Sequence, residues 1–367
     1  MGADEHLSLS IASELVAPVP APRAQPRVGV KPGMVQPLAD RGAFPWLVAD
    51  IGGTNARFGW VGGSGGAVQH VRKLPVPGHA GPAQAARAYL ADMAGTLGAA
   101  FNAPRRAAFA VATAVAGDRV VLTNSHWDFS CTAVQAELGL DDLLVLNDFE
   151  ALALALPHLQ PAQLRCHGVV PQARGTLAVI GPGTGLGVAG VVETATGWVA
   201  LPGEGGHTTL AASDDFESEL LAQVRRTYRH VSAERLLSGI GLPVLHGAVA
   251  AVTGNSATPL AAEEVVARGL AGSDPCCRQT LDVFCALLGS FAGNVALTLG
   301  ARGGVYIGGG IVPRLGELFF ASAFREKFEA KGRFAAYLQQ VPTALITDTL
   351  VALTGAAAAI EQHSRHG

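Results

Sequence analysis

The sequence predicts an α/β fold made of two related halves, and three observations lead to this expectation. An apolar strand at residues 47–49 runs into a glycine turn, and a second strand at 57–61 returns antiparallel to it. The same order of strand, glycine turn and strand recurs at 177–180 and 188–192. The chain has 367 residues, enough for two domains of the usual size. A unit that recurs in a chain of this length indicates two α/β halves rather than one sheet.

Helical and extended segments alternate along the rest of the chain. Residues 82–99 repeat apolar side chains with helical periodicity, at Ala86, Leu90, Met93 and Leu97. Asp214 and Glu217 have the spacing of a capping box before a helix at 216–226. Further helices are expected at 131–138, 281–299 and 349–362, and further strands at 107–112, 120–122, 143–146 and 304–307.

The first 45 residues differ from the rest of the chain. Seven of the 21 prolines lie there, and because proline fixes φ and removes a backbone donor, we expect an extended or mobile tail. The expected domains are a small one, residues 46–157 plus 350–367, and a large one, residues 158–349.

Composition and charge exclude several classes of protein. Hydrophobic residues make up 49% and charged residues 15%, which is not the polar composition of a disordered chain. A net charge of −3 provides no field that would gather nucleic acid or an anionic membrane. The five cysteines form no C-x-x-C pair, which predicts a reducing cytoplasm and no zinc site. The sequence has no uninterrupted apolar run long enough to predict a membrane span, and a signal peptide is not expected.

Two glycine turns are candidates for binding phosphate. At Asp50–Asn55 a glycine pair lets the backbone approach a ligand, and Asp50 could hold Mg²⁺ through water. A plain hairpin turn is the alternative. At Gly181–Gly187 the glycines alternate, which is not the spacing of a dinucleotide-binding loop. A third run, Gly308–Gly310, follows a strand and leaves an open surface for a base or ribose; a flexible loop is the alternative.

An acidic residue follows the strand at 143–146. Asp148 lies where α/β folds place ligands, and it could accept the proton of a hydroxyl that attacks a phosphate. A helix cap is the alternative use of Asn147 and Asp148, and one residue of the pair could cap while the other faces the site.

Polar side chains suited to sugar hydroxyls occur in three further segments. Glu204 and His207 lie in a glycine-rich loop, and Glu234 is expected in the first turn of a helix. Asn124 and Ser125 add an amide and a hydroxyl. Structural hydrogen bonds and a favourable charge at a helix N-terminus remain the alternatives for His207 and Glu234.

Seven segments follow one another from residue 49 to about residue 314: ADIGGTNARFGWV, LTNSHWDFS, LVLNDFEALALALP, IGPGTGLGVA, PGEGGHTTLAA, SAERLLSGIGL and YIGGGIVPR. In this order they resemble the bacterial glucokinase family, a branch of the actin/hexokinase/Hsp70-like ATPase superfamily. The resemblance implies two related ribonuclease H-like (actin/hexokinase-type) domains around a cleft that closes on its substrates. It implies transfer of phosphate from ATP, with Mg²⁺, to the 6-hydroxyl of D-glucose.

The resemblance also implies roles for individual residues. Asp148 would be the general base, and Asp50 would lie near the metal. Sugar-binding residues would be Asn124, Ser125, Asn147, Asp148, Glu204, His207 and Glu234. Nucleotide-binding residues would be Ala49, Asp50, Ile51, Gly52, Gly53, Thr54, Asn55, Arg57, Gly181, Gly183, Thr184, Gly185, Gly308 and Gly309.

The chain departs from the related ROK sugar kinases, because no cysteine-rich zinc motif follows Gly205–His207. We therefore expect a glucokinase outside the ROK group, in the cytoplasm and as a homodimer. Three alternatives stay open: a kinase for fructose, mannose or N-acetylmannosamine, a non-catalytic sugar sensor, and an actin-like filament ATPase. Asp148 argues against a sensor, and the Glu204, His207 and Glu234 set would be idle in a filament.

Overall fold

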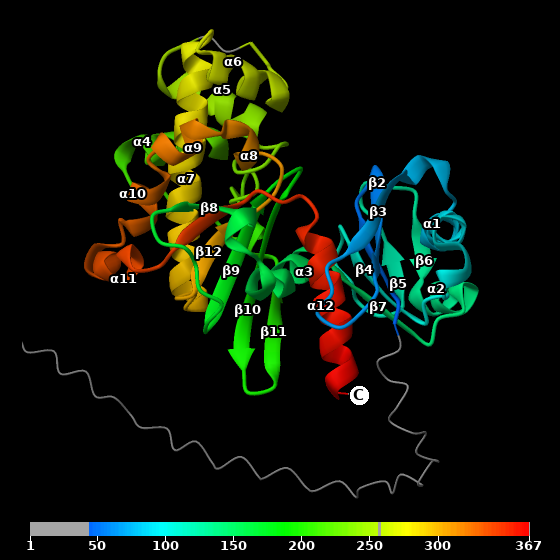
Figure 1. Ribbon diagram of the computed structural model, residues 1–367. Helices are drawn as coiled ribbons and strands as arrows, with labels where there is room; N and C mark the ends of the chain where they lie inside the picture. The colour runs from blue at the N-terminus through cyan, green and yellow to red at the C-terminus, as the bar shows by residue number, and fades with distance from the viewer. Residues whose placement is uncertain (1–43, 256–257, 367) are drawn as a thin grey trace, which may run out of the picture. The chain divides into compact units, whose positions relative to one another are not determined.

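The computed structural model describes residues 44–255 and 258–366, which form an α/β structure with two large sheets and a small ribbon (Figure 1). The tail predicted for residues 1–45 lies almost entirely outside the described residues.

The first sheet has the order β3-β2-β1-β4-β7 and the second the order β11-β10-β9-β12-β13-β8. The strands of the first are β1 (Trp46–Ile51), β2 (Asn55–Val61), β3 (Gln69–Pro75), β4 (Arg106–Val111) and β7 (Asp142–Asn147). Those of the second are β8 (Leu164–His167), β9 (Thr176–Pro182), β10 (Leu186–Thr194), β11 (Gly197–Gly203), β12 (Gly304–Ile307) and β13 (Thr343–Ile346), and the ribbon pairs β5 (Arg119–Val121) with β6 (Asp128–Ser130).

The two sheets repeat one topology. In the first, β3, β2 and β1 are antiparallel neighbours, and β4 and β7 continue in parallel. In the second, β11, β10 and β9 form the same antiparallel meander, β12 and β13 continue in parallel, and β8 adds an antiparallel edge. The expected duplication is therefore confirmed at the level of topology. Each glycine turn follows the central strand of its own sheet.

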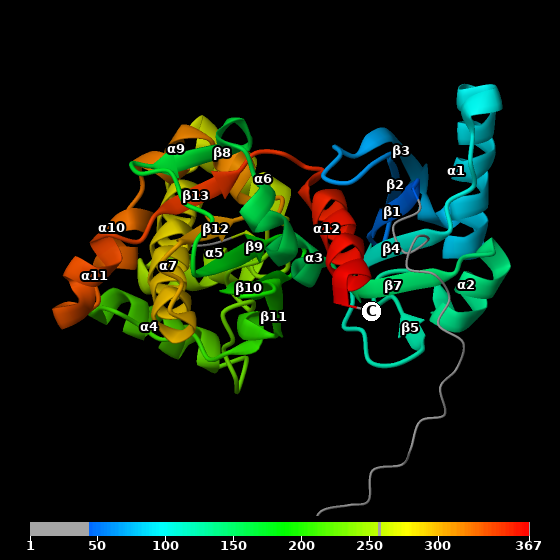
Figure 2. The same ribbon diagram turned by 60° about the horizontal axis from the view of Figure 1, so that its bottom comes forward.

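Most helices pack against only one of the two sheets. The described helices of eight or more residues are α1 (Pro82–Leu97), α2 (Cys131–Leu138), α3 (Asp148–Ala155), α4 (Asp215–Arg225), α5 (Leu242–Val252), α6 (Ala262–Ala271), α7 (Pro275–Leu299) and α12 (Val351–His366). Shorter ones are α8 (Val312–Leu315), α9 (Glu317–Ala321), α10 (Phe324–Glu329) and α11 (Ala335–Gln339). Figure 2 shows α1 and α2 beside the first sheet and α4 to α11 around the second. The predicted cap of α4 is confirmed, since the Asp214 carboxylate accepts from the Glu217 N–H at 2.8 Å.

Helices α3 and α12 lie between the two sheets (Figure 1). One buried apolar cluster joins them to both: it contains Val48 of the first sheet, Val179 of the second, Ala151 of α3 and Ala356 of α12. The helices cross closely at Gly355, where a β-carbon would lie 1.7 Å from the carbonyl oxygen of Ala151. Glycine at this position thus sets how closely α3, which begins at the candidate base, approaches α12.

The long helix α7 is apolar enough, by length and composition, to cross a membrane. Its most apolar window is 72% buried inside the structure. Phe284, Leu288 and Val295 of this helix belong to the core that packs against the second sheet. Such burial is typical of the central helix of a globular domain.

We predict that Gly355→Ala destabilises the fold. The added methyl group meets backbone rather than a side chain that could rotate away, so a cost of about 1–3 kcal/mol is expected. Differential scanning calorimetry should show a lower Tm. The matched control is Gly247→Ala in α5, where a β-carbon meets nothing within 4 Å. There alanine should leave Tm unchanged or raise it, because it favours helix more than glycine does. Equal Tm values for the two variants would contradict the prediction.

Candidate active site

The candidate base lies at the junction of β7 and α3. Asn147 is the N-cap of α3: its Oδ1 accepts from the Phe149 N–H at 2.9 Å, and its Nδ2 donates to the Thr113 carbonyl at 3.0 Å. The parallel strands β1, β4 and β7 end at the same edge of the sheet, so Asp50 and Asp148 both lie there. The expectation that one member of the pair caps the helix is confirmed for Asn147.

The electrostatics of this edge raise the pKa of Asp148 to about 6. Burial is the larger cause, because it disfavours the charged form, and the neighbouring Asp50 carboxylate adds repulsion. Burial also raises the pKa of Asp50, while Arg57 opposes this rise. Arg57 stands directly opposite Asp50 across β1 and β2, and its Nη1 donates to Asp50 Oδ2 at 2.9 Å.

The first glycine turn is tight and touches the segment that carries Asn124. The Gly52 N–H donates to the Asn55 carbonyl at 3.0 Å. A β-carbon at Gly53 would lie 2.5 Å from the carbonyl oxygen of Asn124, so only glycine permits this approach. Thr54 and Asn124 are exposed. The side chains of Ala49 and Ile51 are buried, which leaves only their backbone for a ligand.

Ser125 uses its hydroxyl locally. Its Oγ accepts from the Trp127 N–H at 3.1 Å, and its own N–H donates weakly to the Leu122 carbonyl at 3.4 Å. Trp127 is fully buried, so these bonds fix the loop that presents Asn124.

The second glycine turn uses its glycines in different ways. A β-carbon at Gly181 or Gly187 would lie 2.3 Å or 2.1 Å from the ring of Phe149. A β-carbon at Gly185 would lie 2.4 Å from Oε2 of Glu234. Only Gly183 among these four faces open space, and the adjacent Thr184 is exposed. The part of this turn open to a phosphate group is therefore Gly183–Thr184.

The third glycine run packs on the second. The Gly308 N–H donates to the Ile180 carbonyl at 2.8 Å. Gly309 has a φ of 75° and would, with a β-carbon, meet the Pro182 carbonyl oxygen at 2.3 Å. Gly309 and Gly310 are exposed, so the two turns form one continuous glycine surface.

A carboxylate, an imidazole and a second carboxylate form a row next to this surface. His207 Nδ1 lies 4.0 Å from Glu234 Oε1, and His207 Nε2 lies 4.0 Å from Glu204 Oε2. Glu234 is anchored, because its Oε2 accepts from the Leu186 N–H at 2.8 Å. The Glu234 carboxylate thus contacts the second glycine turn through one oxygen and His207 through the other. Glu204 and His207 are exposed, as groups that meet a ligand must be.

The expectation that Glu234 lies in the first turn of a helix is wrong. Residues 233–240 form turns, and the first following helix begins at Leu242. The backbone here bonds to other segments: the Glu234 N–H donates to the Gly206 carbonyl at 2.8 Å and the Gly239 N–H to the Gly183 carbonyl at 2.8 Å. The segment makes a single turn, in which the Leu237 N–H donates to the Ala233 carbonyl at 2.8 Å, and does not continue as a helix. The bonds to Gly206 and Gly183 hold it against the second glycine turn.

Sequence reasoning missed Phe149 and Gly239, which connect the predicted segments. Their contacts join residues that are distant along the chain, so periodicity and turn chemistry gave no sign of them. The structure brings Asp50 close to Asp148, Gly53 to Asn124, and Glu234 to Gly185 and His207.

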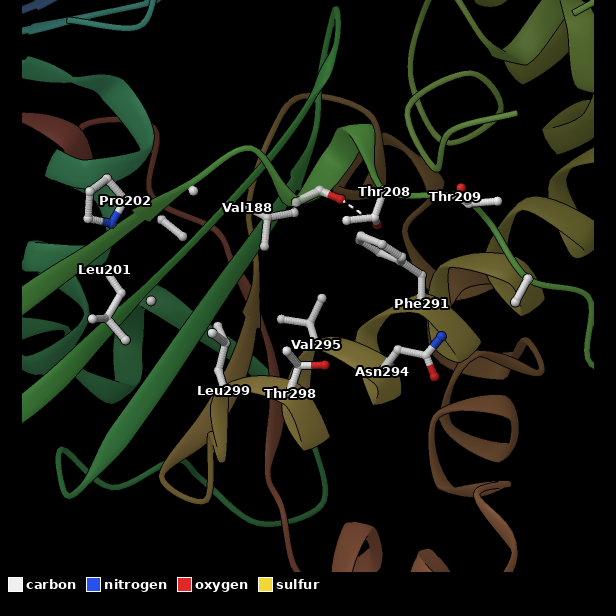
Figure 3. Close-up of a pocket in the computed structure, with 15 residues that line it drawn as sticks. Val188, Leu201, Pro202, Thr208, Thr209, Phe291, Asn294, Val295, Thr298 and Leu299 are labelled. Atoms are coloured by element: carbon white, nitrogen blue, oxygen red, sulfur yellow. Dashed lines mark hydrogen bonds between the residues drawn. The ribbon is translucent and has the colours of Figure 1, made fainter. Parts of the chain in front are cut away.

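An uncharged pocket of about 240 Å³ lies between the second sheet and α7 (Figure 3). Val188 and Leu201 of the second sheet face Phe291 and Val295 of α7 across it. None of its lining residues carries a charge. Gly203, Gly205 and Thr208 line it, whereas Glu204 and His207 do not.

Comparisons with known proteins show which proteins this chain is similar to. The family model described as Glucokinase matches residues 47–363. A glucokinase of Aromatoleum aromaticum is 50% identical over 319 residues, which cover 87% of this chain and 95% of that protein. The crystal structure of a glucokinase from an Antarctic psychrotroph has a TM-score of 0.80 and 38% identity, and covers 86% of this chain and 98% of that one. A ROK family glucokinase from Streptomyces griseus, solved with glucose and AMPPNP, shares the fold at a TM-score of 0.55 and 18% identity, over 87% of this chain and 100% of that one.

We predict that Asp50→Asn lowers the pKa of Asp148, because it removes a neighbouring negative charge that favours the protonated form. Titration of the Asp148 carboxyl carbon by NMR measures this directly and needs no ligand. The matched control is Asp92→Asn on α1, an exposed aspartate paired with Arg72 at 3.1 Å, which should leave the titration unchanged. An unchanged or higher pKa in Asp50→Asn would contradict the electrostatic coupling.

Proposed function

The chain belongs to the glucokinase family and is an ATP-dependent kinase that phosphorylates glucose, and we propose that Asp148 is its general base. One observation carries the assignment. Asp148 is one of two carboxylates at the edge where β1, β4 and β7 end, and burial together with the Asp50 charge raises its pKa to about 6. A base works best when its pKa lies near the operating pH, because it is then ionised and still binds the transferred proton.

The proposed reaction needs only positioning and one proton transfer. The 6-hydroxyl oxygen of glucose attacks the γ-phosphorus of ATP, and the bond to the β,γ-bridging oxygen breaks as ADP leaves. The hydroxyl proton passes to the Asp148 carboxylate. Asn147 holds this carboxylate in place, since its amide bonds both the first turn of α3 and the Thr113 carbonyl.

The sugar is bound by the row of Glu204, His207 and Glu234. Asn124, in the loop that packs against the first glycine turn, completes the set. Sugar hydroxyls both donate and accept, so carboxylates and an imidazole can bond several of them at once. Glu234 is the rigid member, because the Leu186 N–H fixes one of its oxygens at 2.8 Å. The sugar therefore lies beside the turn proposed to hold the phosphates.

The nucleotide is held by backbone rather than by cationic side chains. Gly52–Thr54 and Gly183–Thr184 present N–H and hydroxyl donors to phosphate oxygens, and Gly308–Gly309 borders the adenosine. Arg57 acts through Asp50, to which it is bonded at 2.9 Å. Exclusion of water by domain closure limits hydrolysis of ATP.

Asp50 would hold Mg²⁺ through water. Its carboxylate lies at the edge where the strands end, next to Asp148, and carboxylate oxygen is a donor that Mg²⁺ prefers. Among the described residues no group of three or more His, Cys, Asp or Glu converges on one point, so phosphate oxygens and water would complete the coordination. When bound, Mg²⁺ supplies charge neutralisation on the phosphates.

The proposal includes the domain boundaries, 46–157 plus 350–367 and 158–349. All strands of the first sheet lie within 46–147 and those of the second within 164–346, which supports them. A homodimer in the cytoplasm is the remaining part, and sedimentation equilibrium tests the dimer.

We predict that Asp148→Asn lowers kcat by roughly 10²–10⁴-fold, because the amide cannot accept a proton. Isothermal titration calorimetry should still detect glucose binding. In the wild type, kcat/KM should fall below pH values of about 6, because protonation of Asp148 removes the base. Asp142→Asn, at the opposite end of the same strand, is the matched control and should keep wild-type turnover. Near wild-type turnover by Asp148→Asn would show that another residue is the base.

We predict that glucose is the preferred acceptor. Release of ADP, coupled to a spectrophotometric assay, should give a higher kcat/KM for glucose than for fructose, mannose or N-acetylmannosamine. The comparison between glucose and its epimer mannose is the sharpest, because the two differ at one hydroxyl. Equal values for the two would favour a general hexose kinase, and sugar-independent polymerisation with ATP would favour a filament protein.

A further inference from the structure

The ring of Phe149 fills the space left by two missing side chains. A β-carbon at Gly181 would lie 2.3 Å from Cζ of the ring, and one at Gly187 would lie 2.1 Å from Cδ2 and Cε2. Neither glycine has a positive φ, so the backbone conformation would accept alanine at both positions. Space for the ring, and not backbone strain, is what requires glycine there.

A second residue on the same face of α3 makes a parallel contact. Leu152 follows Phe149 by three positions, and residues with this spacing share one face of a helix. A β-carbon at Gly308 would lie 3.2 Å from Cδ2 of Leu152. The first turn of α3 is thus docked on both glycine runs of the second sheet, although the strand that leads into it, β7, belongs to the first sheet.

Phe149 is also tied to the base through the backbone. Its N–H donates to Asn147 Oδ1 and to Asp148 Oδ1, both at 2.9 Å. A displacement of the backbone at the start of α3 that makes room for the ring would therefore move the Asp148 carboxylate as well.

We propose that Phe149 is a positioning residue, which sets where the Asp148 carboxylate lies relative to the open part of the second glycine turn, Gly183–Thr184. This inference rests on the proposed function. It assigns the glycines of one motif to two tasks: Gly183 leaves room for the phosphate groups, while Gly181 and Gly187 leave room for the ring. A displacement of about 1 Å in a catalytic geometry can cost on the order of 10²-fold in rate.

A size exchange tests the proposal. Gly187→Ala drives a methyl group into the ring and should lower kcat by about 10²-fold with a much smaller change in the KM for glucose. Phe149→Leu shortens the side chain and makes room for that methyl group. The double variant Gly187→Ala/Phe149→Leu should recover most of the lost kcat. Steady-state kinetics over a range of pH, with a calorimetric Tm for each variant, are the measurements.

Gly183→Ala supplies the specificity control. A β-carbon there meets nothing within 4 Å, so any loss that it causes comes from contact with the nucleotide. Phe149→Leu should not rescue it. If Phe149 had a merely structural role, Tm would fall in Gly187→Ala and recover in the double variant Gly187→Ala/Phe149→Leu, while kcat would not follow these changes.

The proposal is overturned by wild-type kcat in Gly187→Ala, or by a double variant whose Tm recovers while its kcat stays at the level of Gly187→Ala. Rescue of Gly183→Ala by Phe149→Leu would also overturn it, because the effect would then be unspecific. Failure of the proposed function is distinguishable, since the wild type would then release no ADP in response to any sugar.

Discussion

The first turn of α3 is where the two sheets of this protein meet in a single short segment. Its N-cap, Asn147, ends a strand of the first sheet, while the ring of Phe149 lies between glycines of the second. The carboxylate of Asp148 stands between these two attachments. Because the helix also crosses α12 at Gly355 with almost no space to spare, its position has little freedom. The geometry of the whole site follows from this one packing arrangement.

The same strand order occurs in both sheets, yet the glycine turns at equivalent positions have acquired different contacts. In the first turn, Gly53 admits the backbone of Asn124. In the second, Gly185 admits the carboxylate of Glu234, and only Gly183 is left open. Most glycines of a motif with the pattern of a phosphate loop therefore serve another purpose here, which is to leave room for neighbouring side chains and backbone. The open part of the motif is short and comprises Gly183 and the exposed Thr184.

Charge at the site is arranged by burial and by repulsion. Asp50 and Asp148 lie at the ends of β1 and β7, two parallel strands with β4 between them. Burial and the neighbouring Asp50 charge raise the pKa of Asp148 to about 6. Burial raises the pKa of Asp50 as well, and its cross-strand partner Arg57 opposes that rise.

The sequence by itself determined the two α/β halves, the strands and glycine turns, a helix cap from either Asn147 or Asp148 and the candidate base, because these follow from local chemistry: periodicity, turn residues and the end of an apolar strand. It also indicated Glu204, His207 and Glu234, but it placed Glu234 on a helix. Tertiary structure decided otherwise, since the segment makes only a single turn and is held by hydrogen bonds to Gly206 and Gly183. The contacts of Phe149 with Gly181 and Gly187, and of Glu234 with Gly185, were likewise decided only by the fold. Each joins residues more than 30 positions apart along the chain, and no local pattern specifies which distant segment will fill the space beside a glycine.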